Sequence, residues 1–333
     1  MTPARFNRRV QAQLRRLLRE GVIDACSYQQ LMDRYPIGRW DWSALGRWFA
    51  VFGAVSLAAG LVLFSRELFV FTLFKLAWSL GLLTAALLLT GYRLRRSKFK
   101  WTKLSLELCA GFSLIGLTFT LGYLYSSGSG NWPALLLLDL LVLLPLAYLL
   151  HNVLLLILTA IVFFAWFGGF SGYSSAWHGY WFGMNYPLRF LFAALAMILA
   201  ALAHRLGERS LLSGYRDFYK VWLSSGVYFA EMALWLLSLF GNFNIAEHWR
   251  SNSVGELWLF NLLWAGGNIA LLALGTRYLL RMLRGYAVTF LIIQGYTLFF
   301  WHIAERLGMV LSTAVAGLTA LALVMYLEKR HRT

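Results

Sequence analysis

The chain has 333 residues, of which 60% are hydrophobic and only 13% are charged, and its mean hydropathy is +0.63. Soluble globular domains carry about a quarter charged residues, so this composition excludes that class. The net charge of +16 does not indicate nucleic-acid binding, because no segment outside the apolar runs is long enough to fold into a basic face. The two cysteines, Cys26 and Cys109, lie too far apart to form a disulfide framework or a metal-ligand spacing.

Residues 1–45 are predicted to form a cytoplasmic amphipathic helical hairpin. Apolar residues recur every three or four positions in the first helix, which Gly21 ends (Phe6, Val10, Leu14, Leu17, Leu18). Asp24 or Ser27 can cap a second short helix that stops before Pro36. We expect this hairpin to fold against its own bundle; the alternative is a basic surface for anionic lipid or a partner protein.

The same stretch carries a family resemblance. The sequence "LLREGVIDACSYQQLMDRYP", followed by "LGRWFAVFGAVSLAAGLVLF", contains Gly21-Val22-Ile23, two glutamines, Tyr35 and a glycine-spaced apolar run. Residues 1–65 thereby resemble the start of a bacterial family of predicted membrane proteins called domain of unknown function 2157, although residues 64–67 depart from the family's usual sequence after its first span. The resemblance implies a bacterial inner-membrane protein without an assigned activity.

Long apolar runs recur from Gly46 to the C-terminus. Each can cross roughly 30 Å of hydrocarbon as a helix, whereas an open sheet would leave backbone groups unpaired in lipid. The sequence therefore predicts an all-α, polytopic transmembrane helix bundle over residues 46–333. Its expected spans are 46–64, 70–92, 104–125, 133–149, 152–170, 187–206, 219–240, 257–275, 285–303 and 307–327.

The basic residues predict the orientation of these spans. Of the 30 lysines and arginines, 25 fall in the N-terminal segment and in alternate connections, four fall on the other side, and Lys75 lies within a span. Because basic connections stay cytoplasmic, both termini are predicted to be cytoplasmic. Anionic lipid headgroups are the expected partners of that side.

Ten spans divide as five plus five across the loop at residues 170–186. An odd number of spans in each half places the halves in opposite orientations, which is the geometry of inverted-repeat transporters. The predicted halves are residues 46–170 and 187–327. Aromatic rings crowd the connecting loop, and we expect them to lie at the headgroup level rather than to form a recognition platform.

A lysine and an aspartate interrupt two apolar runs at similar expected depth. Lys75 and Asp139 both lie near the non-cytoplasmic ends of their spans, so we predict an intramembrane ion pair between them. A structural pair is favoured over a gate, because a buried ion pair often brings no net stability. Glu107 is expected to snorkel toward Lys100 and Lys103.

Glu231 lies near the middle of its span and has no lysine or arginine at its depth. Tyr228 shares its helix face, and Asn268 and Gln294 lie at comparable depth in later spans. These four residues are the candidate midplane polar site. Secondary transporters place solutes at such a depth. The simpler interpretation, which we favour, is a set of interhelical hydrogen bonds that fixes helix register.

Catalytic motifs are weak or absent. Gly169-Phe170-Ser171-Gly172 matches the bare Gly-x-Ser-Gly pattern of rhomboid proteases, but its serine ends a span and lacks a confident histidine partner. We therefore expect no enzyme activity, no catalytic residues, no metal and no cofactor.

Two classes of function stay open. The first is a non-enzymatic scaffold or accessory subunit in envelope processes, with a membrane protein as its partner. The alternative is a secondary transporter or flippase-like carrier of a small molecule or lipid that uses the site around Glu231.

Overall fold

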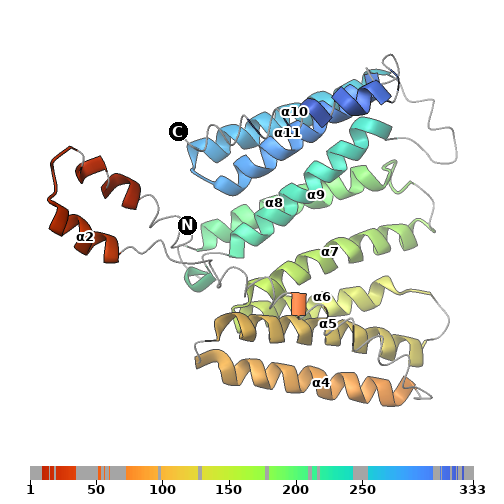
Figure 1. Ribbon diagram of the computed structural model, residues 1–333. Helices are drawn as coiled ribbons and strands as arrows, with labels where there is room; N and C mark the ends of the chain where they lie inside the picture. Colours follow the sequence, from red (N-terminus) through yellow and green to blue (C-terminus); the bar gives the residue numbers. More distant parts are fainter. Residues whose placement is uncertain are drawn as a thin grey trace.

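The structure is a computed structural model. It describes residues 10–14, 16–18, 20–34, 73–96, 99–126, 130–176, 180–208, 212–215, 218–242, 254–302, 310–315 and 317–319, with isolated positions at 52, 53, 56, 60, 308, 321 and 325. Figure 1 shows the course of the chain.

Within these ranges, eight helices are long and apolar enough to cross a membrane. They are α4 (Leu73–Arg93), α5 (Lys100–Leu124), α6 (Pro133–Leu150), α7 (Val153–Ser174), α8 (Tyr186–Gly207), α9 (Phe218–Phe240), α10 (Val254–Arg277) and α11 (Arg281–His302). Each overlaps one expected span, so a multi-pass, helical membrane protein is confirmed. The expected first span, 46–64, is described only at isolated positions, and the last, 307–327, only in part, so the count of ten stays a prediction.

Local sequence explains where several helices begin and end. The Asn152 side chain accepts hydrogen bonds from the amides of Leu154 (2.8 Å) and Leu155 (3.1 Å) and so caps the start of α7. Asn185 caps α8 in the same way. His151 adopts a left-handed conformation (φ 52°) that ends α6, and only His151 and Asn152 separate α6 from α7.

The spanning helices run side by side as antiparallel hairpins (Figure 1). The hairpins α4/α5, α6/α7, α8/α9 and α10/α11 follow the order of the chain, and α9 also contacts α7, α10 and α11. This arrangement makes α9 the centre of the C-terminal half. The inverted repeat of residues 46–170 and 187–327 stays a prediction.

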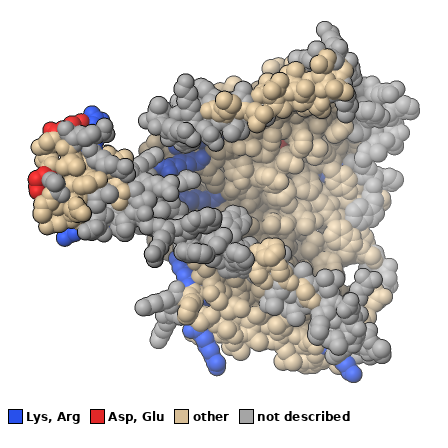
Figure 2. Space-filling view, in the orientation of Figure 1, with Lys and Arg blue, Asp and Glu red and all other residues tan. Residues whose placement is uncertain are grey.

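Charge separates the two ends of the bundle. Successive helices alternate in direction, so the C-termini of even-numbered helices and the N-termini of odd-numbered helices meet at one end, which we call the basic end. Its described basic residues are Arg93, Arg95, Lys100, Lys103, Arg205, Lys220, Arg277, Arg281 and Arg284. In Figure 2, blue side chains gather at this end on the visible face. That the basic end faces the cytoplasm stays a prediction.

A glycine allows α8 and α9 to approach closely. A Cβ atom built on Gly226 of α9 would lie 3.0 Å from the Ala194 carbonyl oxygen and 2.8 Å from an Ile198 side-chain carbon of α8. Such distances leave no room for a methyl group, so glycine sets the α8/α9 packing. Nearby, the rings of Phe164 and Phe229 stack with centroids 3.6 Å apart and join α7 to α9.

Two helical stretches are described near the N-terminus. Residues 10–14 and 16–18 are helical, and α2 (Ala25–Arg34) follows a turn at Gly21, whose φ is 69°. The Asp24 carboxylate accepts hydrogen bonds from the amides of Cys26 and Ser27, and bonds to Ser27 hold its pKa below the usual value. The predicted short helix is therefore present, while the hairpin over the whole of 1–45 stays a prediction.

Candidate functional site

A continuous row of polar side chains lies between α9, α10 and α11, and we call it the polar seam. Its buried members are Glu231, Ser238, Asn261, Trp264, Asn268 and Gln294. All of them lie within apolar helices, at a depth where unpaired polar groups are costly. The seam is the largest buried polar assembly described in the C-terminal half, and it is the candidate site.

Glu231 occupies the middle of the seam. Its carboxyl oxygen Oε2 accepts a hydrogen bond of 2.6 Å from the indole Nε1 of Trp264. Both side chains are buried, since Trp264 is 0% and Glu231 2% exposed. Asn268 lies beside the same carboxyl group and donates its own amide hydrogen to the Trp264 carbonyl (3.2 Å). A tryptophan side chain therefore covers the carboxyl group.

The next layer of the seam joins all three helices. Gln294 of α11 donates to the backbone carbonyl of Asn261 in α10 over 2.8 Å. The Asn261 side chain donates to the Ser238 carbonyl of α9 (3.1 Å) and to the Leu257 carbonyl (3.0 Å). Because these bonds run between helices, they fix the register of α9, α10 and α11.

Two further interhelical bonds extend the seam toward the ends of the bundle. The indole Nε1 of Trp235 donates to the Thr297 hydroxyl over 3.1 Å at the end opposite the basic end. Toward the basic end, the hydroxyls of Ser224 and Tyr286 lie 2.9 Å apart. Polar contacts thus connect α9 to α11 along most of their length.

The seam contains two amide oxygens without a hydrogen-bond partner among the described residues. They are Oδ1 of Asn261 and Oδ1 of Asn268. Asn261 lines one described cavity, of about 140 Å³, together with Ser238 and Thr297 among others, whereas Asn268 lines neither that cavity nor the neighbouring one. Glu231 does not line that cavity or the neighbouring one.

The structure brings together three of the four residues predicted for the midplane site. Glu231 and Asn268 lie in the central layer, and Gln294 lies in the adjoining layer. Tyr228 is 43% exposed and packs edge-on against Phe229; no hydrogen bond joins it to the seam in the described part of the chain. Its hydroxyl needs no buried partner, which explains why it lies apart from the seam.

Sequence reasoning missed Trp264 and Asn261, which hold the two layers together. Both were detectable, because Asn261, Trp264 and Asn268 recur at intervals of three and four and so share one face of α10. In a sequence, a tryptophan within an apolar run is read as a packing residue, because the acceptor for its indole N–H is not visible there. Only the tertiary contact supplies that acceptor.

The predicted ion pair between Lys75 and Asp139 is not formed. Asp139 is 1% exposed, yet neither of its carboxyl oxygens has a hydrogen-bond partner within the described ranges, and Lys75 is exposed. The reason is the order of the helices, since α4 packs on α5, and α6 packs on α5 and α7. Asp139 instead faces Thr118 of α5, whose hydroxyl donates to the Leu114 carbonyl.

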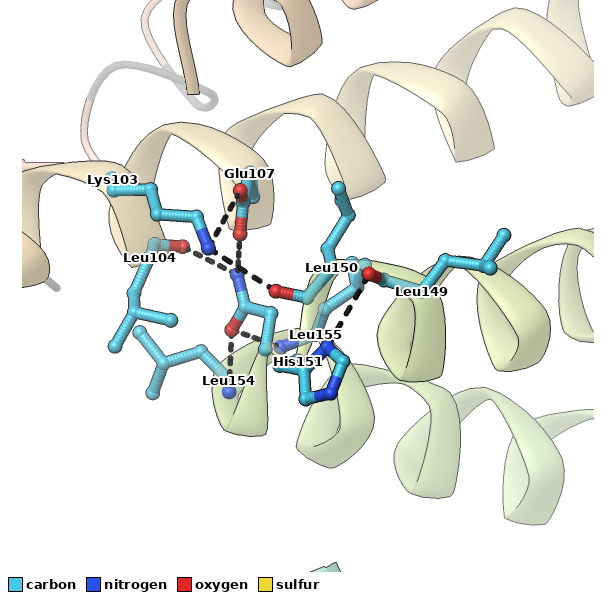
Figure 3. A network of polar contacts seen from close by, with 9 residues as sticks. Lys103, Leu104, Glu107, Leu149, Leu150, His151, Leu154 and Leu155 are labelled. Carbon is cyan, nitrogen blue, oxygen red and sulfur yellow. Dashed lines mark hydrogen bonds and ion pairs between the residues drawn. The ribbon is translucent and has the colours of Figure 1, made fainter. Parts of the chain in front are cut away.

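Glu107 contacts Lys103 as expected, but its side chain is fully buried and therefore does not snorkel. Figure 3 shows its surroundings at the basic end of α5. Asn152 donates to Glu107 Oε2 over 2.8 Å, and Lys103 Nζ lies 3.4 Å from Glu107 Oε1. The same lysine donates to the Leu150 carbonyl (3.1 Å). The carboxylate therefore ties α5 to the tight turn between α6 and α7.

The Gly-x-Ser-Gly pattern is part of the end of α7. The Ser171 hydroxyl is buried and donates to the Gly168 carbonyl over 3.2 Å, as a helical serine commonly does. Its backbone carbonyl accepts from the buried guanidinium of Arg189 (3.3 Å), which also lies over the Tyr186 ring. His178, the loop histidine, lies outside the described residues.

Comparisons of the chain with protein-family models, with curated proteins and with solved structures found no match. The chemistry of the polar seam is therefore judged from its own geometry.

Proposed function

We propose that the protein is a non-enzymatic scaffold or accessory subunit of envelope processes in the bacterial inner membrane, with both termini in the cytoplasm. The observation that carries this proposal is the use of the buried polar groups. Glu231, Gln294 and the Asn261 amide group bind other helices of the same chain. Groups engaged in this way hold helix register and are not exposed to a solute.

The enclosure of Glu231 supports the same function. A carrier that binds a solute or a coupling ion through a carboxylate needs an open route to that group in at least one state. Trp264 covers this carboxyl group, and the described cavities do not reach it. The basic end and the resemblance of residues 1–65 to a bacterial membrane family support the proposed location and orientation.

Reconstituted protein tests the scaffold function against transport. Proteoliposomes that contain a pH-sensitive dye are expected to show no proton flux above that of empty vesicles, in the wild type and in Glu231→Gln alike. Glu231→Gln is expected to alter only the unfolding midpoint of the protein. Flux that depends on Glu231 would overturn the scaffold proposal.

A specific observation favours the transporter as the second candidate. Oδ1 of Asn261 and Oδ1 of Asn268 are buried acceptors, in one seam, for which the described residues supply no donor. Native interiors contain few such groups, and they often mark a place for water, an ion or a ligand. Counterflow of a labelled solute out of vesicles, abolished by Asn268→Leu, would establish this function in place of the first.

Orientation is tested with single cysteines in a variant that lacks Cys26 and Cys109. Ser213→Cys lies at the basic end, and Asn131→Cys lies at the opposite end. In intact cells, a membrane-impermeant maleimide is expected to label Asn131→Cys and to leave Ser213→Cys unlabelled until the cells are lysed. The reverse pattern would contradict cytoplasmic termini.

A further inference from the structure

Tyr228 presents its side chain on the outside of the bundle at the middle of α9. The residue is 43% exposed, and no hydrogen bond joins its hydroxyl to any residue that the structure describes. It lies ten residues after the first residue of α9 and twelve before the last. At 1.5 Å per residue, it is roughly 15 Å from one end of the helix and 18 Å from the other. That is the centre of a hydrocarbon layer about 30 Å thick.

The position of Tyr228 differs from that of every other exposed tyrosine in the described part of the chain. Those tyrosines lie within one residue of the end of a spanning helix, and they are Tyr92, Tyr123, Tyr125, Tyr173 and Tyr278. Headgroups and water surround a tyrosine at that level, so its hydroxyl is solvated while its ring stays in an apolar layer. Tyr228 has no such solvent beside it.

Hydrocarbon cannot satisfy the hydroxyl of Tyr228. Acyl chains offer neither a donor nor an acceptor, and an unpaired hydroxyl in such surroundings is unfavourable. The side chain starts too far from both membrane surfaces to reach a headgroup, as polar side chains near helix ends do. The hydroxyl needs no partner within the bundle, but it needs one from outside. Whatever covers Tyr228 therefore brings a polar group to the centre of the membrane.

Tyr228 belongs to a stripe of exposed and partly exposed side chains along α9, which we call the α9 stripe. Its members recur at intervals of three and four residues and are Ser225, Tyr228, Met232 and Leu236. The other faces of α9 pack within the bundle: Gly226 meets α8, and Phe229 stacks on α7. Glu231 bonds to α10, and Ser224 bonds to α11. The α9 stripe lies between the faces that contact α7 and α11, whose places beside α9 Figure 1 shows.

A second copy of the chain supplies the polar group that Tyr228 needs. Every copy inserts with its basic end on the same side of the membrane, so a two-fold axis between two copies runs along the membrane normal. Tyr228 of each copy then lies at the same depth. A tyrosine hydroxyl both donates and accepts, so the two hydroxyls can bond to each other. Like charges do not oppose this contact, because Lys220 and Glu231, the charged residues of α9, lie off the α9 stripe.

We propose that the α9 stripe is the contact surface between two copies of this chain, with the two Tyr228 hydroxyls hydrogen-bonded across the two-fold axis at the centre of the membrane. Spacing of three and four residues suits two helices that cross at about 20°. The small side chain of Ser225, one turn away, lets the two backbones approach. Met232 and Leu236 extend the contact with apolar surface. This inference goes beyond the proposed function and does not depend on it.

Disulfide cross-linking in cell membranes tests the surface in the full-length protein. In a variant that lacks Cys26 and Cys109, Met232→Cys places a thiol on the α9 stripe and keeps Tyr228. Leu199→Cys is the matched control, because Leu199 is 66% exposed on α8 and lies eight residues from the basic end of that helix. Mild oxidation is expected to give a covalent dimer of Met232→Cys and to leave Leu199→Cys monomeric. Equal cross-linking of both variants, or none in Met232→Cys, would overturn the proposal.

Removal of the hydroxyl alone tests the hydrogen bond. Purified protein labelled with a fluorophore is diluted into increasing amounts of lipid, and the dimer fraction is counted by single-molecule photobleaching. Loss of one interhelical hydrogen bond corresponds to about a 3- to 20-fold rise in the dissociation constant, which is the result expected for Tyr228→Phe. Tyr92→Phe makes the same chemical change at an exposed tyrosine at the end of α4 and is expected to leave the constant unchanged. Equal effects of the two substitutions would contradict a role for the Tyr228 hydroxyl.

The same two experiments identify any other occupant of the α9 stripe. If Met232→Cys forms a covalent product of a different mass in cells, while the purified protein stays monomeric at every dilution, the stripe binds another membrane protein and the second copy is refuted. If the purified protein is monomeric and no product forms in cells, lipid alone covers Tyr228, and the proposal is likewise refuted. The proton-flux measurement tests the scaffold function separately, so either proposal can fail without the other.

Discussion

The indole Nε1 of Trp264 donates a hydrogen bond of 2.6 Å to Oε2 of Glu231, and both residues are buried between α9 and α10. This pair connects the only glutamate of α9 to the helix that follows it in the chain. The carboxyl group therefore contributes to helix packing whatever else it does.

The Glu231–Trp264 bond is expected to be measurable as a coupling energy. Trp264→Phe removes the donor and part of a buried ring, and should lower the free energy of unfolding by about 2 to 4 kcal/mol. Glu231→Gln keeps an acceptor oxygen and should change it by about 1 kcal/mol or less. A double-mutant cycle by detergent-induced unfolding should give a coupling of about 0.5 to 2 kcal/mol. Additive effects would show that the bond brings no net stability.

Asn152 is expected to be among the most sensitive polar positions. Asn152→Ala removes the cap of α7 and leaves Glu107 Oε2 without its donor, so the free energy of unfolding should fall by about 2 to 4 kcal/mol. Thr90→Ala, at an exposed hydroxyl that bonds only within its own helix, is the control and should have an effect of about 0.5 kcal/mol or less. Equal effects of the two substitutions would contradict the network in Figure 3.

Replacement of Asp139 is expected to stabilise the protein. Its carboxyl oxygens are buried without hydrogen bonds from the described residues, so Asp139→Leu removes a desolvated polar group at little cost in volume. The unfolding free energy should rise by about 1 to 3 kcal/mol in detergent-induced unfolding. Lys75→Met should change it by about 1 kcal/mol or less. If both substitutions strongly destabilised the protein, the result would instead support the ion pair between Lys75 and Asp139 that was predicted from the sequence.

Close packing at Gly226 gives a prediction with a built-in control. Gly226→Ala pushes a methyl group against the Ala194 carbonyl and should lower the unfolding free energy by about 1 to 3 kcal/mol. Gly267→Ala, at a helical glycine where an added methyl group would meet no described atom within 4 Å, should be neutral or stabilising by up to about 1 kcal/mol. The same assay distinguishes them, and a harmless Gly226→Ala would mean that α8 and α9 can move apart.

The described spanning helices were predictable from sequence, because their signal is local. A run of apolar residues long enough to cross hydrocarbon has no alternative to a helix, and the chain around Asn152 and Asn185 marks two of the starts. Glu231, Asn268 and Gln294 were found together for a related reason, since depth along a span can be counted in residues. Depth alone paired Lys75 with Asp139 incorrectly, because it says nothing about which helices are neighbours.

The sequence by itself determined that this protein is a bundle of membrane-crossing helices whose basic residues collect at one end, since hydrophobic length and charge distribution act residue by residue along the chain. Only the tertiary structure decided which helices touch, and therefore that Trp264 covers Glu231, that Asp139 faces Thr118 rather than Lys75, and that Asn261 faces a cavity. Those facts depend on rotation and order of helices, which are set by side-chain packing between segments far apart in the chain.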